Sequence, residues 1–212
     1  EVHQITLPGL ANVHSHAFQR GMAGLAEHRG ADRDDNFWSW REVMYRFLDR
    51  LTPEDMQAIA AMAYAEMLET GYTHVGEFHY LHNDALGRAY GNPAEMAGST
   101  VAAAHATGIG LTLLPVFYAH SNFGGQAPNH GQRRFIQDLG SFAKLMDACR
   151  PLLAEGDQLG IAPHSLRAVT PDQLTALIAM HRQGPIHIHA AEQQREVRDS
   201  LAFSGKRPVE WL

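Results

Sequence analysis

Short apolar runs alternate with longer segments of helical period along the chain. The apolar runs that predict strands begin near residues 5, 73, 111, 158 and 186. Each run is followed by a segment in which apolar residues recur every three or four positions, which is the spacing of one helix face. No hairpin signal separates one run from the next. This order predicts an α/β protein whose parallel strands are joined by right-handed crossovers.

Residues typical of helix ends mark several of the predicted helices. Thr52 is expected to cap a helix that has Pro53 at its first position, and Gly108 is expected to end another. The segment 18–51 predicts a long loop with a helical part, and loops of this length are usually functional or disordered. The predicted helices cover 52–68, 93–107 and 133–153, with two more that begin at Thr170 and near Glu192.

The spacing of the units distinguishes between two kinds of parallel sheet. The strands begin about 45 residues apart on average, which is long for a doubly wound sheet and normal for a barrel with functional loops. We therefore predict the α/β fold of a TIM-type (β/α)8 barrel, with about five of its βα units in this chain. In such a barrel the carboxyl ends of the strands form the active-site face. A wall of five strands is expected to expose apolar residues at its edges.

The composition is that of a globular protein, because 45% of the 212 residues are hydrophobic and 19% are charged. The net charge of −6 argues against a broad basic surface for nucleic acid or an anionic membrane. No apolar run approaches the roughly 20 residues that span a bilayer, and the first residues lack the order of a signal peptide. The single cysteine, Cys149, excludes an internal disulfide. We expect a cytoplasmic protein with a small-molecule partner.

Fourteen histidines invite a search for metal ligands, and two clusters fall at predicted strand ends. His14 and His16 are two residues apart, so both imidazoles can face one metal ion. His189 ends the fifth predicted strand, and Glu192 follows three residues later. A zinc ion lowers the pKa of a bound water, and a glutamate beside it can pass the proton to a leaving nitrogen. An H-x-H alone also arises by chance, and His187 is more simply a packed histidine.

Two further clusters follow the fourth and second predicted strands. His164 could polarise a substrate atom or bind the metal, and Arg167 could bind a carboxylate through two hydrogen bonds. The alternative is a surface turn with a salt bridge. The aromatic and histidine side chains of 78–82 could line a pocket or pack under a loop. Because all four clusters lie at strand ends, their convergence on one metal-centred site is the stronger interpretation.

The motifs resemble those of the amidohydrolase superfamily of metal-dependent hydrolases, because Leu7-Pro-Gly-Leu10 runs into an H-x-H strand and an H-x-x-E follows later. The HAFQR and APHSLR segments are more specific and resemble the formimidoylglutamate deiminases of that superfamily. The likeness runs through essentially the whole chain. It rests on Asn12-Val-His-Ser-His-Ala-Phe-Gln-Arg20, Phe78-His-Tyr-Leu-His82, Tyr90-Gly-Asn-Pro93 and Ala162-Pro-His-Ser-Leu-Arg167.

This resemblance implies a reaction and a set of site residues. The reaction is the hydrolysis of N-formimidoyl-L-glutamate to N-formyl-L-glutamate and ammonia, a step of histidine degradation. One zinc ion would be bound by His14, His16 and His189, and zinc hydroxide would attack the formimidoyl carbon with Glu192 as proton shuttle. Iron and manganese accept the same ligands. A homodimer is expected for the complete enzyme. The implied substrate-binding residues are Gln19, Arg41, Tyr80, His164 and Arg167.

Two residues of the family pattern have no counterpart in this chain. The family completes its zinc site with an aspartate on the last barrel strand and uses another histidine on a strand after the H-x-x-E, whereas Asp199 lies on a predicted helix. We therefore expect residues 9–212 to form the N-terminal part of a barrel and residues 1–8 to be the remnant of a flanking β-sandwich.

Two other functions stay open at this point. One is a deaminase of the same superfamily that acts on a guanine-like, cytosine-like or triazine substrate. Arg167 and Gln19 argue against it, because flat neutral bases need no carboxylate clamp. The other is an incomplete barrel without activity, which would bind no metal tightly.

Overall fold

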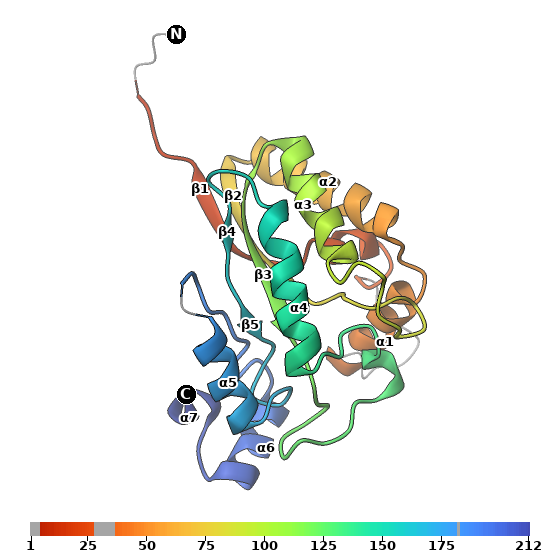
Figure 1. Cartoon of the computed structure of the whole chain (residues 1–212), viewed down its shortest axis with the longest axis vertical. Coiled ribbons are helices and arrows are strands. Elements are labelled where there is room, and N and C mark those ends of the chain that lie inside the picture. Colours follow the sequence, from red (N-terminus) through yellow and green to blue (C-terminus); the bar gives the residue numbers. More distant parts are fainter. Residues whose placement is uncertain (1–4, 28–36, 182) are drawn as a thin grey trace.

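The computed structural model describes residues 5–27, 37–181 and 183–212. Parallel strands form one sheet, and helices cover one of its faces (Figure 1). Residues 1–4 of the predicted sandwich remnant and 28–36 of the predicted long loop lie outside the described residues. The main elements are β1 (Leu10–Ser15), α1 (Phe37–Leu48), α2 (Pro53–Glu69), β2 (Tyr72–His79), α3 (Glu95–Thr107), β3 (Gly110–Phe117), α4 (Leu139–Cys149), β4 (Gln158–Leu159), β5 (Ala162–Pro163), α5 (Pro171–Met180), α6 (Gln194–Ser204) and α7 (Pro208–Trp211), with short 3-10 helices η1 (Ala17–Met22), η2 (His130–Gln132) and η3 (Arg150–Leu152).

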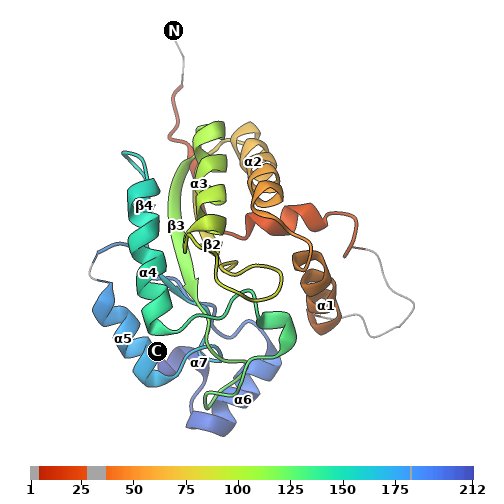
Figure 2. The same ribbon diagram turned by 45° about the vertical axis from the view of Figure 1, so that its right-hand side comes forward.

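The strands lie in the sheet in the order in which they occur in the chain. β1 pairs with β2, β2 with β3, and β3 with both β4 and β5, and every pair is parallel. Helices α2, α3 and α4 lie side by side along one face of this sheet (Figure 2). α5, α6 and α7 gather beyond β5 (Figure 1). The sequential parallel order confirms the α/β class and is the arrangement of a barrel wall.

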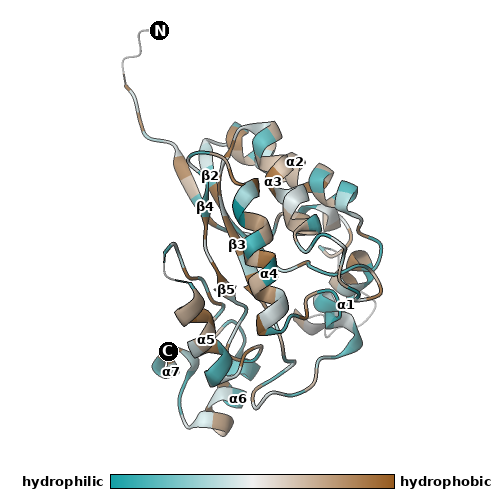
Figure 3. Ribbon diagram, viewed as in Figure 1, coloured by the Kyte–Doolittle hydropathy of each residue, from teal (hydrophilic) through white to brown (hydrophobic). Residues whose placement is uncertain are grey.

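The central strand shows how the alternation of side chains builds two cores. Leu111, Leu113 and Phe117 pack with α3 and α4 in one core. Leu114 and Val116 have the opposite parity and belong to a second core, which lies under η1 and α1. Most of β3 is coloured brown (Figure 3), because leucine, valine and phenylalanine make up most of this strand. The second core lies near the strand ends, where the predicted site residues are found.

The predicted helix ends are largely confirmed. The Thr52 side chain accepts the N–H of Asp55, and Asp55 accepts the N–H of Thr52, so both residues form the capping box of α2. Thr170 caps α5 in the same way. Gly108 ends α3 with a φ of 79°, a left-handed conformation that favours glycine. The helix predicted over 133–153 begins later, at Leu139, because Asp138 caps it there.

Three predicted strands differ from the structure. The first strand begins at Leu10 instead of Ile5, and Leu10 and Val13 are exposed on β1, as expected for an edge strand. The strand predicted over 158–163 divides into β4 and β5. Gly160 lies between them, and its backbone is so close to Pro185 that a Cβ would be 2.5 Å from a carbonyl oxygen. The strand predicted over 186–190 is present only as two isolated parallel bridges.

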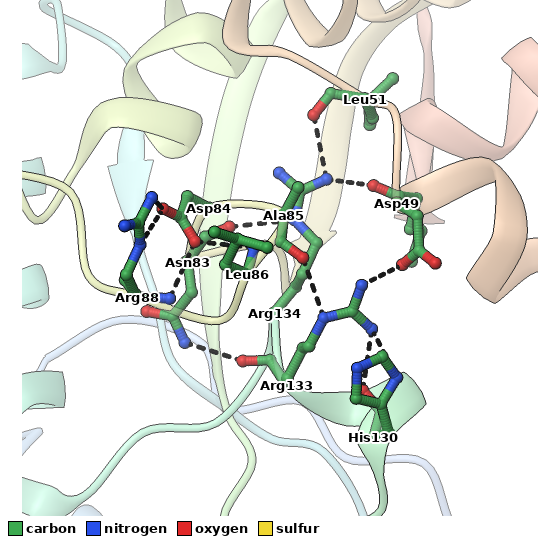
Figure 4. A network of polar contacts seen from close by, with 11 residues as sticks. Asp49, Leu51, Asn83, Asp84, Ala85, Leu86, Arg88, His130, Arg133 and Arg134 are labelled. Atoms are coloured by element: carbon green, nitrogen blue, oxygen red, sulfur yellow. Dashed lines mark hydrogen bonds and ion pairs between the residues drawn. The ribbon is translucent and has the colours of Figure 1, made fainter.

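The end of α1 is tied to the rest of the molecule by two adjacent arginines (Figure 4). Arg134 is buried and donates hydrogen bonds to the carbonyl oxygens of Leu48, Leu51 and Asn83. Arg133 pairs with Asp49 at 2.6 Å. These contacts join segments that are far apart in the chain and fix the position of α1. Within the described residues, no helix has the length and apolar content required to cross a membrane.

Candidate active site

Three imidazoles meet where β1 and the last bridged segment end. The Nε2 atom of His14 lies 3.2 Å from that of His16 and 3.2 Å from that of His189. One ring nitrogen from each residue lies within 4.8 Å of the others. His189 reaches this position because the bridge between Ser165 and His189 aligns its segment with the end of β5. The three predicted metal ligands therefore form one cluster.

Contacts to neighbouring groups orient two of these rings. The Nδ1 atom of His16 is 3.0 Å from the carbonyl oxygen of Phe78, so its N–H points to the backbone and Nε2 is left as a lone-pair donor. The ring of His189 stacks on Phe78 with 4.3 Å between centroids. Burial lowers the pKa of His16 to about 4 and that of His189 to about 3. Both imidazoles are therefore neutral at pH 7, as metal ligands must be.

The backbone directly after His16 is held by a buried carboxyl group. Glu77 on β2 accepts the N–H of Ala17 at 2.7 Å, directly after His16. Glu77 is fully buried, and this burial raises its pKa. The chain leaves β1 and enters η1 at this point, so the carboxyl group satisfies an N–H that has no partner inside the short helix.

The cluster fits the requirements of a zinc ion. A tetrahedral zinc with bonds of about 2.0–2.1 Å places its nitrogens roughly 3.3 Å apart. The 3.2 Å separations around His14 are close to this value. Catalytic zinc sites commonly have three protein ligands, and neutral imidazole is a preferred one. The donor set is therefore suitable for a catalytic metal.

A cavity of about 430 Å³ opens on the imidazole cluster, and all nine predicted site residues line it. Six come from or next to strand ends, which is the placement that a barrel predicts. Gln19 lies on η1, Arg41 lies on α1, and Glu192 lies just before α6. The nine residues are His14, His16, Gln19, Arg41, Tyr80, His164, Arg167, His189 and Glu192.

Two charged groups of opposite sign share this cavity. Burial raises the pKa of Glu192, and the Arg167 guanidinium acts in the opposite direction. Arg167 is 7% exposed. The ring of His164 lies 5.0 Å from that of His189, and burial holds its pKa well below the usual value. A neutral histidine and a buried arginine therefore stand beside the cluster, together with a carboxyl group that holds its proton more strongly than usual.

Polar and aromatic side chains form the remaining wall. The Gln19 amide donates to the hydroxyl of Tyr80 at 3.3 Å, and the two come from η1 and the end of β2. The Arg41 guanidinium lies 5.6 Å from the centre of the Tyr45 ring. One face of α1 lines the cavity at helical spacing, through Phe37, Trp40, Arg41, Met44 and Tyr45.

Several histidines that the sequence singled out lie outside the cavity. His79 has the opposite strand parity to Tyr80, so it points away from the site and lies 3.4 Å from Thr100 on α3. His82 is buried, with Nε2 2.8 Å from the carbonyl oxygen of Val116. His187 does not line the cavity. Burial raises the pKa of the Cys149 thiol to about 12, so this thiol stays protonated and unreactive at neutral pH.

Sequence reasoning missed much of the aromatic wall. Tyr118 and Phe135 line the cavity but were not predicted as site residues. Tyr118 follows β3 and has the parity of Leu114 and Val116, so the strand-end rule could have found it. No local signal places Phe135, which lies in the segment between η2 and α4.

Comparisons with known proteins identify close relatives. A formimidoylglutamate deiminase from Pseudomonas aeruginosa is 56% identical over 97% of this chain and 46% of its own length. The crystal structure of an amidohydrolase from Brucella melitensis has 60% identity and a TM-score of 0.93, over 97% of this chain and 46% of that one. An adenosine deaminase from Xanthomonas campestris with bound zinc has 22% identity and a TM-score of 0.67, over 96% of this chain and 40% of that one, and shows the fold alone.

These matches assign the fold and the family. The chain spans about half the length of the curated relatives it matches. Its parallel βα units correspond to part of the TIM-type barrel of the structural neighbours. The sequence profile of the Amidohydrolase family matches residues 5–212. The chain belongs to the amidohydrolase family.

Proposed function

We propose that this chain carries the active site of a formimidoylglutamate deiminase, which hydrolyses N-formimidoyl-L-glutamate to N-formyl-L-glutamate and ammonia in histidine degradation. The observation that carries the proposal is the meeting of three neutral imidazoles, Glu192 and two arginines in one cavity. The relative from Pseudomonas aeruginosa, 56% identical, supports the same reaction.

The imidazoles of His14, His16 and His189 are proposed to hold one zinc ion. When bound, zinc activates a water molecule and polarises the group that the water attacks. Iron and manganese accept the same ligands, so the metal content must be measured. The neutral state of the three imidazoles at pH 7 supports this assignment, because no proton has to be displaced before the metal binds.

Glu192 is proposed to move the proton. Its carboxylate takes a proton from the attacking water as the carbon–oxygen bond forms, and it delivers that proton to the formimidoyl nitrogen, which becomes an amino group. It then takes the proton of the new hydroxyl group and delivers it to the same nitrogen, so that the carbonyl group forms as the carbon–nitrogen bond breaks and ammonia leaves. Burial raises the pKa of Glu192, which favours proton uptake, while Arg167 keeps the carboxylate available at neutral pH. Because burial and Arg167 change the pKa of Glu192 in opposite directions, this side chain can both take up and release the proton.

The other predicted residues are proposed to hold the substrate. The two carboxylates of formimidoylglutamate fit Arg41 and Arg167, because a guanidinium binds a carboxylate through two parallel hydrogen bonds. Gln19 and Tyr80 provide neutral donors, and their mutual hydrogen bond fixes both side chains. His164, neutral and close to His189, is placed to polarise the formimidoyl group.

The charge of the cavity favours this substrate over a neutral base. The buried guanidinium group of Arg167 lines a cavity of about 430 Å³, and an uncharged ring would offer it no carboxylate to bind. Deaminases of purine compounds match this chain at 27% identity or less, and triazine hydrolases at 18% show the fold alone. A deaminase of neutral bases is therefore the weaker alternative.

The first experiment measures metal content and ammonia release together, on the natural protein that carries this sequence. Wild type should contain near-stoichiometric zinc and release ammonia from N-formimidoyl-L-glutamate. Glu192→Gln should keep the metal and lose turnover by at least about 100-fold, because general acid–base catalysis contributes that much. Glu155→Gln, an exposed change far from the cavity, is the matched control. A metal-free, inactive wild type would favour the inactive-barrel alternative.

A second variant tests the substrate class. Arg167→Ala should weaken the binding of substrates with carboxylates and leave turnover of a neutral amidine nearly unchanged. An equal loss on both substrates would contradict the carboxylate role.

Three further expectations remain proposals. Residues 9–212 are the N-terminal part of the barrel, and residues 1–8 are the remnant of a β-sandwich. A cytoplasmic location is supported by the single cysteine, which is buried and free. A homodimer is the commonest assembly of soluble enzymes and is tested by light scattering.

A further inference from the structure

Tyr118 is a hydrogen-bond donor in the wall of the cavity that the sequence resemblance did not include. This residue follows β3, lines the cavity and is 4% exposed. Its ring lies 4.5 Å from the ring of His164, and 5.7 Å from that of Phe135. The aromatic contacts hold the ring, so the hydroxyl group has a defined position in the wall.

Gln132 on η2 determines how that hydroxyl group bonds. The Gln132 side chain is 1% exposed, and its Oε1 accepts the backbone N–H of Asn129 at 2.8 Å. A backbone N–H can only donate, so the amide oxygen must face Asn129. The amide nitrogen therefore faces Tyr118, and it donates to the hydroxyl oxygen at 2.6 Å.

A hydroxyl group that accepts at its oxygen still has its own proton to donate. Among the residues that the structure describes, this hydroxyl group accepts a hydrogen bond from Gln132 and donates none. Burial raises the pKa of this hydroxyl group, and the nearby Arg167 and Arg41 lower it. Because the effect of burial is the larger one, the proton is retained at neutral pH. The free proton thus lies in the same cavity as the two guanidinium groups.

We propose that Tyr118 determines specificity by donating its hydroxyl proton to a carboxylate oxygen of the substrate, and that Gln132 is a positioning residue that holds the hydroxyl group in the donating orientation. This inference rests on the proposed function. A neutral donor beside guanidinium groups adds a directed hydrogen bond to a carboxylate without adding charge. A substrate that placed a neutral apolar ring against Tyr118 would leave the hydroxyl proton unpaired in a buried site and would therefore bind more weakly.

The test uses the natural protein loaded with zinc and compares Tyr118→Phe with wild type. The variant keeps the ring and removes the hydroxyl group. KM for N-formimidoyl-L-glutamate should rise about 10-fold or more, as expected for loss of a hydrogen bond to a charged group, while kcat changes less than about 2-fold. The inhibition constant of glutarate, a dicarboxylate without the formimidoyl group, should rise by the same factor. Tyr72→Phe, at the opposite end of β2, is the matched control and should change neither value.

Gln132→Met separates positioning from general structural damage. Methionine has a similar size but does not donate, so KM should rise about 3-fold or more in the wild-type background. In the Tyr118→Phe background the same change should have no further effect, because Gln132 acts through the hydroxyl group. If Tyr118→Phe cannot be purified in folded form, the Gln132→Met variant still tests the inference through the KM and glutarate measurements.

The outcomes distinguish this inference from the proposed function. Wild-type protein that neither turns over formimidoylglutamate nor binds glutarate would overturn both. An active wild type whose KM and glutarate inhibition are unchanged by Tyr118→Phe would overturn only the role of Tyr118. Full additivity of the two substitutions would overturn the positioning role of Gln132.

Discussion

Arg134 is the residue whose replacement should weaken the fold most through polar contacts. Its side chain is 1% exposed, and its guanidinium group donates to the carbonyl oxygens of Asn83 at 3.0 Å and Leu51 at 2.9 Å (Figure 4). A third hydrogen bond reaches the carbonyl oxygen of Leu48 at the end of α1. Arg134→Met keeps much of the aliphatic stem and removes all three donors.

The expected loss follows from the number and burial of these contacts. A hydrogen bond from a charged donor contributes about 1.5–3 kcal/mol. The three carbonyl groups belong to buried residues. Removing the buried guanidinium also removes its desolvation cost, so the losses do not add fully. We expect the free energy of unfolding to fall by about 3–5 kcal/mol, which is at the upper end for one substitution.

Urea unfolding followed by circular dichroism measures this change at 25 °C. Arg88→Met is the matched control, because the Arg88 side chain is 71% exposed and its ion pair with Asp84 lies at the surface, where such pairs contribute little to stability. A loss below about 1 kcal/mol for Arg134→Met, or one equal to that of the control, would show that the three contacts do not hold α1 in place.

Three further changes probe other parts of the structure. Burial lowers the pKa of His82 from 6.5 to about 4, so between these pH values unfolding takes up a proton, and the free energy of unfolding decreases by about 1.4 kcal/mol for each unit by which the pH is lowered. His82→Gln should reduce this decrease between pH 7 and pH 5 in urea titrations. An unchanged decrease would contradict the role of His82. Glu77→Ala removes the acceptor for the Ala17 N–H and should lower zinc affinity about 10–100-fold in a chelator competition. Glu77→Gln keeps an acceptor oxygen and should retain most of the zinc affinity. Equal zinc affinities for wild type and Glu77→Ala would refute this role of Glu77. Gly108→Ala should lower the free energy of unfolding by about 1 kcal/mol, because Gly108 has a φ of 79°. Gly98→Ala inside α3 should leave this free energy unchanged or raise it by up to about 1 kcal/mol. Thermal unfolding measures both variants, and a reversed order of their stabilities would refute the argument from backbone conformation.

The cluster of three imidazoles could be predicted from the sequence because it depends on local rules. Side chains two residues apart on a strand point to the same side. This rule predicts that His14 and His16 lie close together, as they do in the structure. His189 joined them because the carboxyl ends of parallel strands share one edge. The same parity also predicts that His79 and Tyr80 point to opposite faces.

The helical wall of the site could not be predicted in this way. The position of α1 depends on contacts such as the one between Arg134 and the carbonyl oxygen of Leu48, which are 86 residues apart. Nothing in the sequence near α1 indicates these partners. The segment around His189 is similar, because its apolar content predicts a strand, whereas the structure forms only two isolated bridges there.

The division of the cavity between strand ends and one helix has a consequence for how new activities could arise. The three clustered imidazoles lie at or beside strand ends, whereas five side chains from a single face of α1 line another part of the cavity. Random libraries confined to those five positions would change which compounds enter the cavity and would leave the three imidazoles unchanged. Natural divergence could follow the same route, with one helix as the variable part and an unchanged reaction centre beneath it.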